Sequence, residues 1–162
     1  YGSDGPNAYL DLSYSYVARW QASREPAKSV ARDIIPVLII AYERPEYLRQ
    51  TLASILQHRS DMRIFPLWAS QDGDHAGVTQ MLEEHKNQKS LDRHLRFPGQ
   101  RRKTGYHRLA EHYKWALDKV FDEGYEQLII IEDDLEVSPD FFTYMQATLP
   151  LLRADPRLIC VS

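Results

Sequence analysis

The feature that most restricts the fold of this chain is a short, uninterrupted apolar segment followed at once by an amphipathic helical pattern. Pro36–Ala41 reads Pro-Val-Leu-Ile-Ile-Ala and is followed by polar and charged residues. A strand buried on both faces of a sheet has this composition. Pro45 suits the first turn of a helix. The apolar residues after it recur on one helical face: Leu48, Leu52, Ile55 and Leu56.

The same unit recurs along the chain. Further strands are predicted in three segments: Ile64–Ser70, Leu91–Phe97 and Leu128–Ile131. Further helices are predicted over Val78–His85, over Leu109–Phe121 with Gly124 just past its end, and from Ser138, with Ser138 as the cap and Pro139 and Asp140 in the first turn. This alternation of strands and helices predicts the α/β fold class, with a mostly parallel sheet flanked by helices on both faces.

The chain divides into two parts of different composition. Residues 1–33 are polar, tyrosine-rich and irregular, and we interpret them as a stem or linker segment with one short helix near Ser15–Gln21. Residues 34–162 carry the α/β pattern, and a length of 162 residues suits one domain or part of a larger one. Because the chain begins at Tyr1 and Ile159–Ser162 has the composition of a buried strand, we expect a fragment of a longer protein, truncated at the C-terminus.

Composition and motifs exclude several classes of function. The net charge of -3 shows no basic excess, so no nucleic-acid partner is expected. No apolar segment reaches the ~20 residues that a membrane span needs. The lone Cys160 cannot form an internal disulfide, and the six histidines do not cluster as metal ligands would. A serine–histidine–acid arrangement, a CxxC pair and a P-loop are all absent from the sequence, which indicates no covalent nucleophile.

Charged residues follow three of the predicted strands. They lie in Tyr42–Arg44, in Gln71–Asp74, which is predicted to be a turn, and in Glu132–Asp134. Ligands of open parallel sheets bind at the carboxyl ends of the strands. We therefore expect a binding site where these three segments meet. A basic loop is predicted over Pro98–Thr104, either solvated or folded over phosphate groups.

The strongest single motif is the acidic triplet Glu132-Asp133-Asp134, directly after an apolar strand. Adjacent carboxylates at the mouth of a buried strand repel one another unless a cation or hydrogen-bond donors offset their charge. Hard cations such as Mg²⁺ and Mn²⁺ prefer oxygen ligands and often share them with substrate phosphates. The triplet therefore indicates a metal–diphosphate site, and a solvated acidic turn is the alternative.

Three further residues are candidates for ligand binding. Arg44, beside a helix N-terminus, can pair with phosphate oxygens, although it can equally pair with Glu43 or Glu46 on the surface. Asp72 can accept a hydrogen bond from the N–H of a base, or it can stabilise an Asp-Gly turn. His112 can reach a nucleotide, although a partly buried structural histidine is the commoner case at such a position.

Several motifs in order resemble the Golgi GlcNAc-transferase I family. The longest is Ile131–Phe142, which reads Ile-Glu-Asp-Asp-Leu-Glu-Val-Ser-Pro-Asp-Phe-Phe. The others are Ile35–Ala41, Phe65-Pro66 with Ser70-Gln71-Asp72, Gly105-Tyr106 with His112-Tyr113 and Trp115-Ala116-Leu117, and Pro150-Leu151-Leu152 with Ala154-Asp155-Pro156. The resemblance covers roughly residues 34–162, and the ordered series is far more specific than the acidic triplet alone.

The resemblance implies a GT-A fold, Mn²⁺ as cofactor, and inverting transfer of N-acetylglucosamine from UDP-GlcNAc to O2 of a terminal α-1,3-mannose of a glycoprotein N-glycan. It implies that Asp134 ligates Mn²⁺ directly, that Glu132 and Asp133 hold the ribose and sugar of the donor, and that Arg44 contacts the diphosphate. Asp72 and His112 are implied to contact the uracil. The catalytic base of the family lies on a later loop, past Ser162, so none is assigned and the fragment alone is expected to be inactive.

The resemblance also implies a lumenal domain of a single-pass type II protein of the Golgi membrane, with its anchor in a preceding segment. Family members often carry a disulfide-bonded cysteine pair where Tyr42 and Gly73 stand, so this chain lacks that link. Cys160 matches a family cysteine whose partner would follow Ser162. Alternative functions are another GT-A transferase such as an O-mannose GlcNAc-transferase, a nucleotidyltransferase, or a non-catalytic GT-A-like binding domain.

Overall fold

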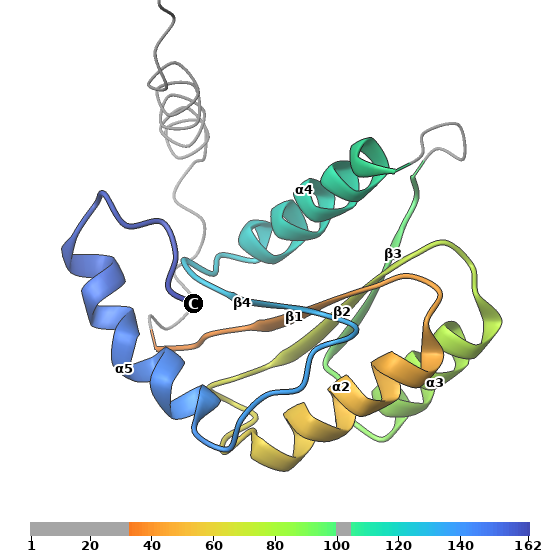
Figure 1. The fold of residues 1–162 in the computed structure, drawn as a ribbon, viewed down its shortest axis with the longest axis horizontal. Helices are drawn as coiled ribbons and strands as arrows, with labels where there is room; N and C mark the ends of the chain where they lie inside the picture. The colour runs from red at the N-terminus through yellow and green to blue at the C-terminus, as the bar shows by residue number, and fades with distance from the viewer. Residues whose placement is uncertain (1–32, 100–104) are drawn as a thin grey trace, which may run out of the picture.

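The computed structural model describes residues 33–99 and 105–162, and within them the chain forms a four-stranded parallel sheet with helices on both faces (Figure 1). The elements follow in the order β1 (Val37–Ala41), α2 (Pro45–His58), β2 (Leu67–Asp72), α3 (Ala76–Asn87), β3 (Arg93–Phe97), α4 (Tyr106–Asp122), β4 (Ile129–Glu132) and α5 (Phe141–Ala154). The predicted stem, its short helix and most of the basic loop lie outside the described residues. The predicted α/β class and parallel sheet are confirmed.

The two faces of the sheet carry separate cores. Helices α2, α3 and α5 cover one face and α4 covers the other (Figure 1). Alternate residues of β1 divide between the cores, because Val37 and Ile39 pack towards α2 and α5 whereas Leu38 and Ile40 pack towards α4. All five residues of β1 are buried, as predicted for a central strand.

Helix α2 begins where the sequence predicted. Pro45 occupies the start of the helix, and the spacing of its apolar residues produces one fully buried stripe: Leu48, Thr51, Leu52 and Ile55. Burying one leucine side chain contributes roughly 1.5–3 kcal/mol to folding. This packing fixes α2 against the sheet and so places its N-cap residue, Arg44, just after the end of β1.

Helix α4 presents a stripe of the same kind to the opposite face. Its buried residues His112, Ala116 and Val120 are spaced four apart and therefore lie on one side of the helix. Ala116 and Val120 pack against Leu38 and Trp68, which anchors the helix to the sheet. The same face consequently carries His112 to the carboxyl end of the strands.

Strand order and register bring the ends of the strands together. The order is β3-β2-β1-β4, so the chain proceeds from β1 in one direction and places β4 on the other side of β1. Ala41 pairs with Gln71, and Ile40 pairs with Glu132. The boundary between β1 and β4 is thus a topological switch point, where ligands of such sheets bind. Tyr42 follows β1 and Asp133 follows β4 at this point.

Several local predictions are wrong. The strand predicted at Ile64 begins at Leu67, because Ile64 and Phe65 belong to a turn that bonds Phe65 N to Asp61 O. That strand continues through Gln71 and Asp72, so the predicted turn is confined to the residues after them, where Gly73 has a φ of 79°.

The predicted cap of the last helix is also wrong. Helix α5 starts at Phe141, and the Ser138 hydroxyl donates to Asp140 Oδ1 instead of capping the helix. The segment Ile159–Ser162 forms no strand, because it pairs with none of the described strands, and Ile159 is 75% exposed. Strand β4 is apolar as predicted, but Ile130 is 42% exposed, so this strand is not buried on both faces.

Candidate functional site

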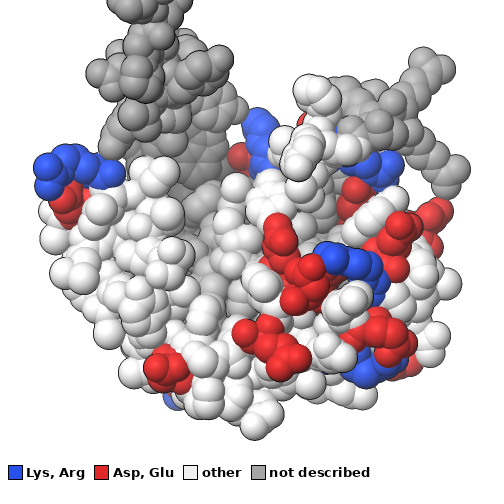
Figure 2. Space-filling model, in the orientation of Figure 1, with Lys and Arg blue, Asp and Glu red and all other residues white. Residues whose placement is uncertain are grey.

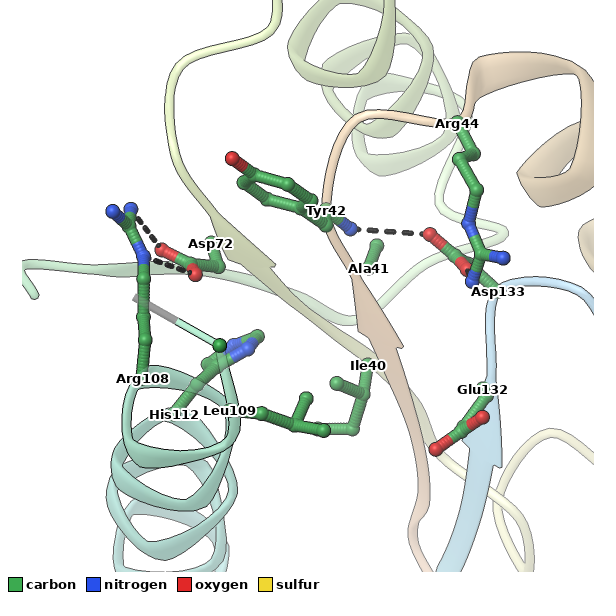
Figure 3. A pocket seen from close by; sticks show the side chains of 11 residues that line it. Ile40, Ala41, Tyr42, Arg44, Asp72, Arg108, Leu109, His112, Glu132 and Asp133 are labelled. Carbon is green, nitrogen blue, oxygen red and sulfur yellow. Dashed lines mark hydrogen bonds and ion pairs between the residues drawn. The ribbon is translucent and has the colours of Figure 1, made fainter. Parts of the chain in front are cut away.

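A hollow of about 370 Å³ lies at the carboxyl end of the sheet, between β1, β4 and the start of α4 (Figure 3). Its walls come from four elements and the loops after them: Ile40, Ala41, Tyr42, Arg44, Asp72, Gly105, Arg108, Leu109, His112, Glu132 and Asp133. The loops and strand ends that the sequence predicted to converge therefore line one cavity. Acidic side chains, with basic ones among them, concentrate on the side of the molecule to which the strands run (Figure 2).

Asp133 forms the floor of the acidic end. Its side chain is 1% exposed, Oδ2 accepts from the backbone N–H of Tyr42 at 3.1 Å, and Oδ1 accepts from the guanidinium of Arg44. Figure 3 shows this carboxylate between Tyr42 and Arg44. The buried charge is thus offset by one backbone donor and one ion pair, which join the end of β4 to the end of β1.

Arg44 also binds Asp134. Its Nη1 lies 2.8 Å from Asp134 Oδ2, and the two side chains are 45% and 33% exposed. Although burial alone would lower it, the two carboxylates hold the pKa of Arg44 above its usual value. Arg44 pairs with these two acids rather than with Glu43 or Glu46, the alternatives that the sequence left open. A guanidinium therefore supplies positive charge beside the residue predicted to bind metal.

Glu132 projects from β4 on the other side of the acidic cluster, towards α4. Its Oε1 accepts from the Tyr113 hydroxyl at 2.6 Å. Burial and then this hydrogen bond raise the pKa of Tyr113, so its hydroxyl remains protonated and donates to the carboxylate. Glu132 is exposed and borders the hollow, so its carboxylate stays accessible to a ligand.

The opposite end of the hollow contains a second ion pair. Arg108 Nε donates to Asp72 Oδ2 and Arg108 Nη2 donates to Asp72 Oδ1, both at 2.7 Å. This is the bidentate geometry that guanidinium and carboxylate favour. These bonds raise the pKa of Arg108. The guanidinium carbon also lies 5.9 Å from the centroid of the Tyr42 ring. Asp72 is 6% exposed and is therefore held in one orientation at the wall of the cavity.

His112 lies beside Asp72, beneath the same wall. It is 2% exposed, its ring stacks on Phe97 with centroids 5.0 Å apart, and its Nε2 lies 2.7 Å from Ser70 Oγ. Burial lowers the pKa of His112 to about 4, against the opposing attraction of Asp72. The imidazole is therefore neutral near pH 7, so one ring nitrogen donates and the other accepts.

Tyr42 and Gly73 pack directly against each other, although the resemblance would place a cysteine pair there. A methyl group built on Gly73 would lie 3.2 Å from Tyr42 Cε2, so the aromatic ring covers this glycine. The ends of β1 and β2 are therefore joined by a non-covalent contact at this point.

The chemistry of the acidic end suits a hard divalent cation, because Asp133 and Asp134 carry carboxylate oxygens and the Asp134 side chain is 33% exposed. Among the described residues, however, no group of three or more His, Cys, Asp or Glu side chains is arranged to hold a metal ion. A cation bound here would depend on other ligands, such as the phosphates and waters with which Mg²⁺-type ions complete their coordination.

In the described ranges, no helix is both long and apolar enough to cross a membrane.

The structure brings five predicted site residues to the lining of one cavity: Arg44, Asp72, His112, Glu132 and Asp133. Asp134 joins them through Arg44 at the rim. Sequence reasoning missed Arg108, Ser70 and Tyr113. The spacing of Arg108 four residues before His112 places both on one face of α4, and this periodicity was the available signal.

This parallel sheet with a charged hollow at its switch point is a fold of the GT-A glycosyltransferase type. Two crystal structures of S. aureus TarS share it at 14% identity: one has a TM-score of 0.55 and covers 74% of this chain and 33% of that chain, and the other has a TM-score of 0.56 and covers 74% and 20%. The chain belongs to the GNT-I family, since the sequence model of that family matches residues 14–162.

The family assignment agrees with a curated relative. The chain is 35% identical over 138 residues to the alpha-1,3-mannosyl-glycoprotein 2-beta-N-acetylglucosaminyltransferase of Arabidopsis thaliana. The match covers 80% of this chain and 30% of that relative. The predicted family and fold are confirmed, and this chain spans less than a third of the length of the relative it matches.

Proposed function

We propose that this chain forms the donor-binding part of an inverting N-acetylglucosaminyltransferase that uses UDP-GlcNAc and acts on a terminal α-1,3-mannose of glycoprotein N-glycans. The observation that carries the proposal is the division of one hollow into two chemically different ends. One end offers Asp72 and His112, which suit the nucleotide base of the donor. The other offers Arg44 beside Asp133 and Asp134, which suits a diphosphate and its cation. Membership of the GNT-I family supports the choice of sugar and acceptor.

The residues divide the work of binding. At one end the Asp72 carboxylate accepts a base N–H, and at the other the Arg44 guanidinium pairs with diphosphate oxygens as negative charge grows on the departing UDP. Glu132 and Asp133 also line the hollow, and we assign them to the ribose and sugar of the donor. A divalent cation such as Mn²⁺, held by Asp134, would supply further neutralisation of the diphosphate.

Transfer with inversion also needs a base that removes the proton of the acceptor hydroxyl. We assign this role to none of Glu132, Asp133 and Asp134. The family resemblance attributes it to a later loop. Residence in the Golgi, with a membrane anchor outside the described residues, remains a prediction from the same resemblance.

Calorimetric titration of UDP-GlcNAc into the full protein, with and without Mn²⁺, tests the donor site. Binding is expected to require Mn²⁺ and to weaken by at least about tenfold in Asp134→Ala, since charge-assisted contacts contribute roughly 1.5–3 kcal/mol. Asp118→Ala removes an acid on the far part of α4 that pairs with Lys114, and should bind normally.

Absence of binding by a folded protein would contradict the proposal and favour a non-catalytic domain of the same fold. Preference for a different nucleotide sugar would favour another GT-A transferase. Binding of equal strength with and without Mn²⁺ would refute the metal part alone.

A further inference from the structure

Ser70 lies behind the base-binding end of the hollow, two residues before Asp72 on β2. Residues two apart on a strand point to the same face, so both side chains project towards α4. Ser70 is fully buried, and its Oγ lies 2.7 Å from His112 Nε2. Ser70 thus contacts one of the two residues proposed to bind the base, but it does not itself line the cavity.

The direction of this hydrogen bond follows from the partners available. Within residues 33–99 and 105–162, the Ser70 hydroxyl makes no other hydrogen bond than the one to His112. A buried hydroxyl hydrogen needs an acceptor, and the neutral imidazole offers one through its unprotonated nitrogen. The hydroxyl therefore donates to Nε2, and the ring proton resides on Nδ1.

The second ring nitrogen meets the hollow. No described residue accepts from or donates to His112 Nδ1. In the described part of the chain, the Thr51 hydroxyl is the only side-chain nitrogen or oxygen that is both fully buried and without a hydrogen-bond partner. Because His112 Nδ1 has no partner and is not such an atom, it must keep some exposed surface. That surface faces the cavity that His112 lines.

We propose that Ser70 is a positioning residue that holds His112 in the Nδ1–H tautomer, so that the cavity offers a donor from His112 beside an acceptor from Asp72. The consequence for binding rests on the proposed function. An N–H beside a carbonyl, as on uracil, matches this acceptor–donor pair. The edge of cytosine carries an acceptor nitrogen beside an amino group, so it reverses both partners and leaves both unsatisfied.

Nitrogen-15 NMR of the imidazole groups in the free protein tests the tautomer directly. The wild type is expected to show a protonated Nδ1 and an unprotonated Nε2 for His112 at pH 7. Ser70→Ala should shift the population towards protonated Nε2, whereas Ser70→Thr keeps the hydroxyl and should preserve the wild-type tautomer. Ser90→Ala is the matched control, because Ser90 forms a similar bond to His85, 2.9 Å from its Nδ1, away from the hollow.

Binding of UDP and CDP to the same variants tests the consequence. The preference for UDP is expected to fall by about tenfold in Ser70→Ala, the effect of one neutral hydrogen bond, and to remain unchanged in Ser90→Ala. A protonated Nε2 in the wild type, or a tautomer that Ser70→Ala leaves unchanged, would overturn the assignment. A protein that binds no uridine nucleotide would refute the proposed function, while the tautomer of the free protein still decides the role of Ser70.

Discussion

Breaking the ion pair between Arg108 and Asp72 should lower the free energy of unfolding by an amount that can be worked out from the structure. Arg108→Met removes a guanidinium that is 21% exposed from an aspartate side chain that is 9% exposed, at two bonds of 2.7 Å. Breaking a fully buried ion pair costs roughly 3–5 kcal/mol, because the remaining charge loses its partner. Partial exposure of Arg108 lets water replace some of that interaction, so we expect a loss of about 2–3 kcal/mol in the free energy of unfolding.

A double-mutant cycle separates the ion pair from the packing of the arginine side chain. The double variant Arg108→Met with Asp72→Asn no longer carries an unpaired charge, so it should be more stable than the sum of the two single changes predicts, by about 1.5–2 kcal/mol. Urea unfolding of the four proteins measures these energies. Arg49→Met is the control, since Arg49 pairs with Glu46 in full solvent and should cost less than about 0.5 kcal/mol. A coupling energy below about 0.5 kcal/mol would refute the proposed rigid support of Asp72.

Three further predictions address the core, the histidine and the glycine at the hollow. Leu52→Ala, at a fully buried site, should lower the free energy of unfolding by about 2–5 kcal/mol in urea unfolding; a loss below 1 kcal/mol would contradict the packing of α2. Because the pKa of His112 is about 4 in the fold and 6.5 in its absence, the unfolded chain binds the extra proton between these values, and stability should fall by up to about 3 kcal/mol as pH falls from 6.5 to 4. His112→Gln should remove that part of the pH dependence, and an unchanged pH profile would contradict the buried neutral imidazole. Gly73→Ala should cost more than about 1 kcal/mol, because its φ is 79° and the added methyl meets Tyr42; thermal unfolding compared with Gly77→Ala, at a helical glycine without positive φ whose added methyl would lie 3.3 Å from His75 Cε1, checks this.

The sequence predicted the elements whose apolar pattern matches their burial. Strand β1 and helix α2 were found because a continuous apolar segment and a stripe at helical spacing each have one favourable structure. The start of α5 was misplaced, since Ser138 has a nearby carboxylate in Asp140 that competes for its hydroxyl. The segment Ile159–Ser162 has the composition of a strand, but strand formation depends on a neighbour, which composition does not reveal.

The sequence predicted which residues lie at the site, but not which of their side chains contact one another. Strand-exit reasoning selected Arg44, Asp72 and the acidic triplet, because the carboxyl ends of parallel strands meet at one edge. It did not predict that Arg44 binds Asp133 or that Arg108 binds Asp72, since these partners lie 89 and 36 residues apart in the chain. The family resemblance added His112, whose burial against Phe97 and Ser70 depends on how α4 lies across the sheet.

The contact between Tyr42 and Gly73 has a consequence for the conditions under which the hollow keeps its shape. A disulfide between the ends of β1 and β2 would make that wall depend on the redox potential of its surroundings. Here an aromatic ring over a glycine, with Arg108 at 5.9 Å from the ring centroid, holds the same strand ends without a reducible bond. Reducing agents should therefore leave this wall of the hollow intact, and the chain can complete it during folding before any oxidising step.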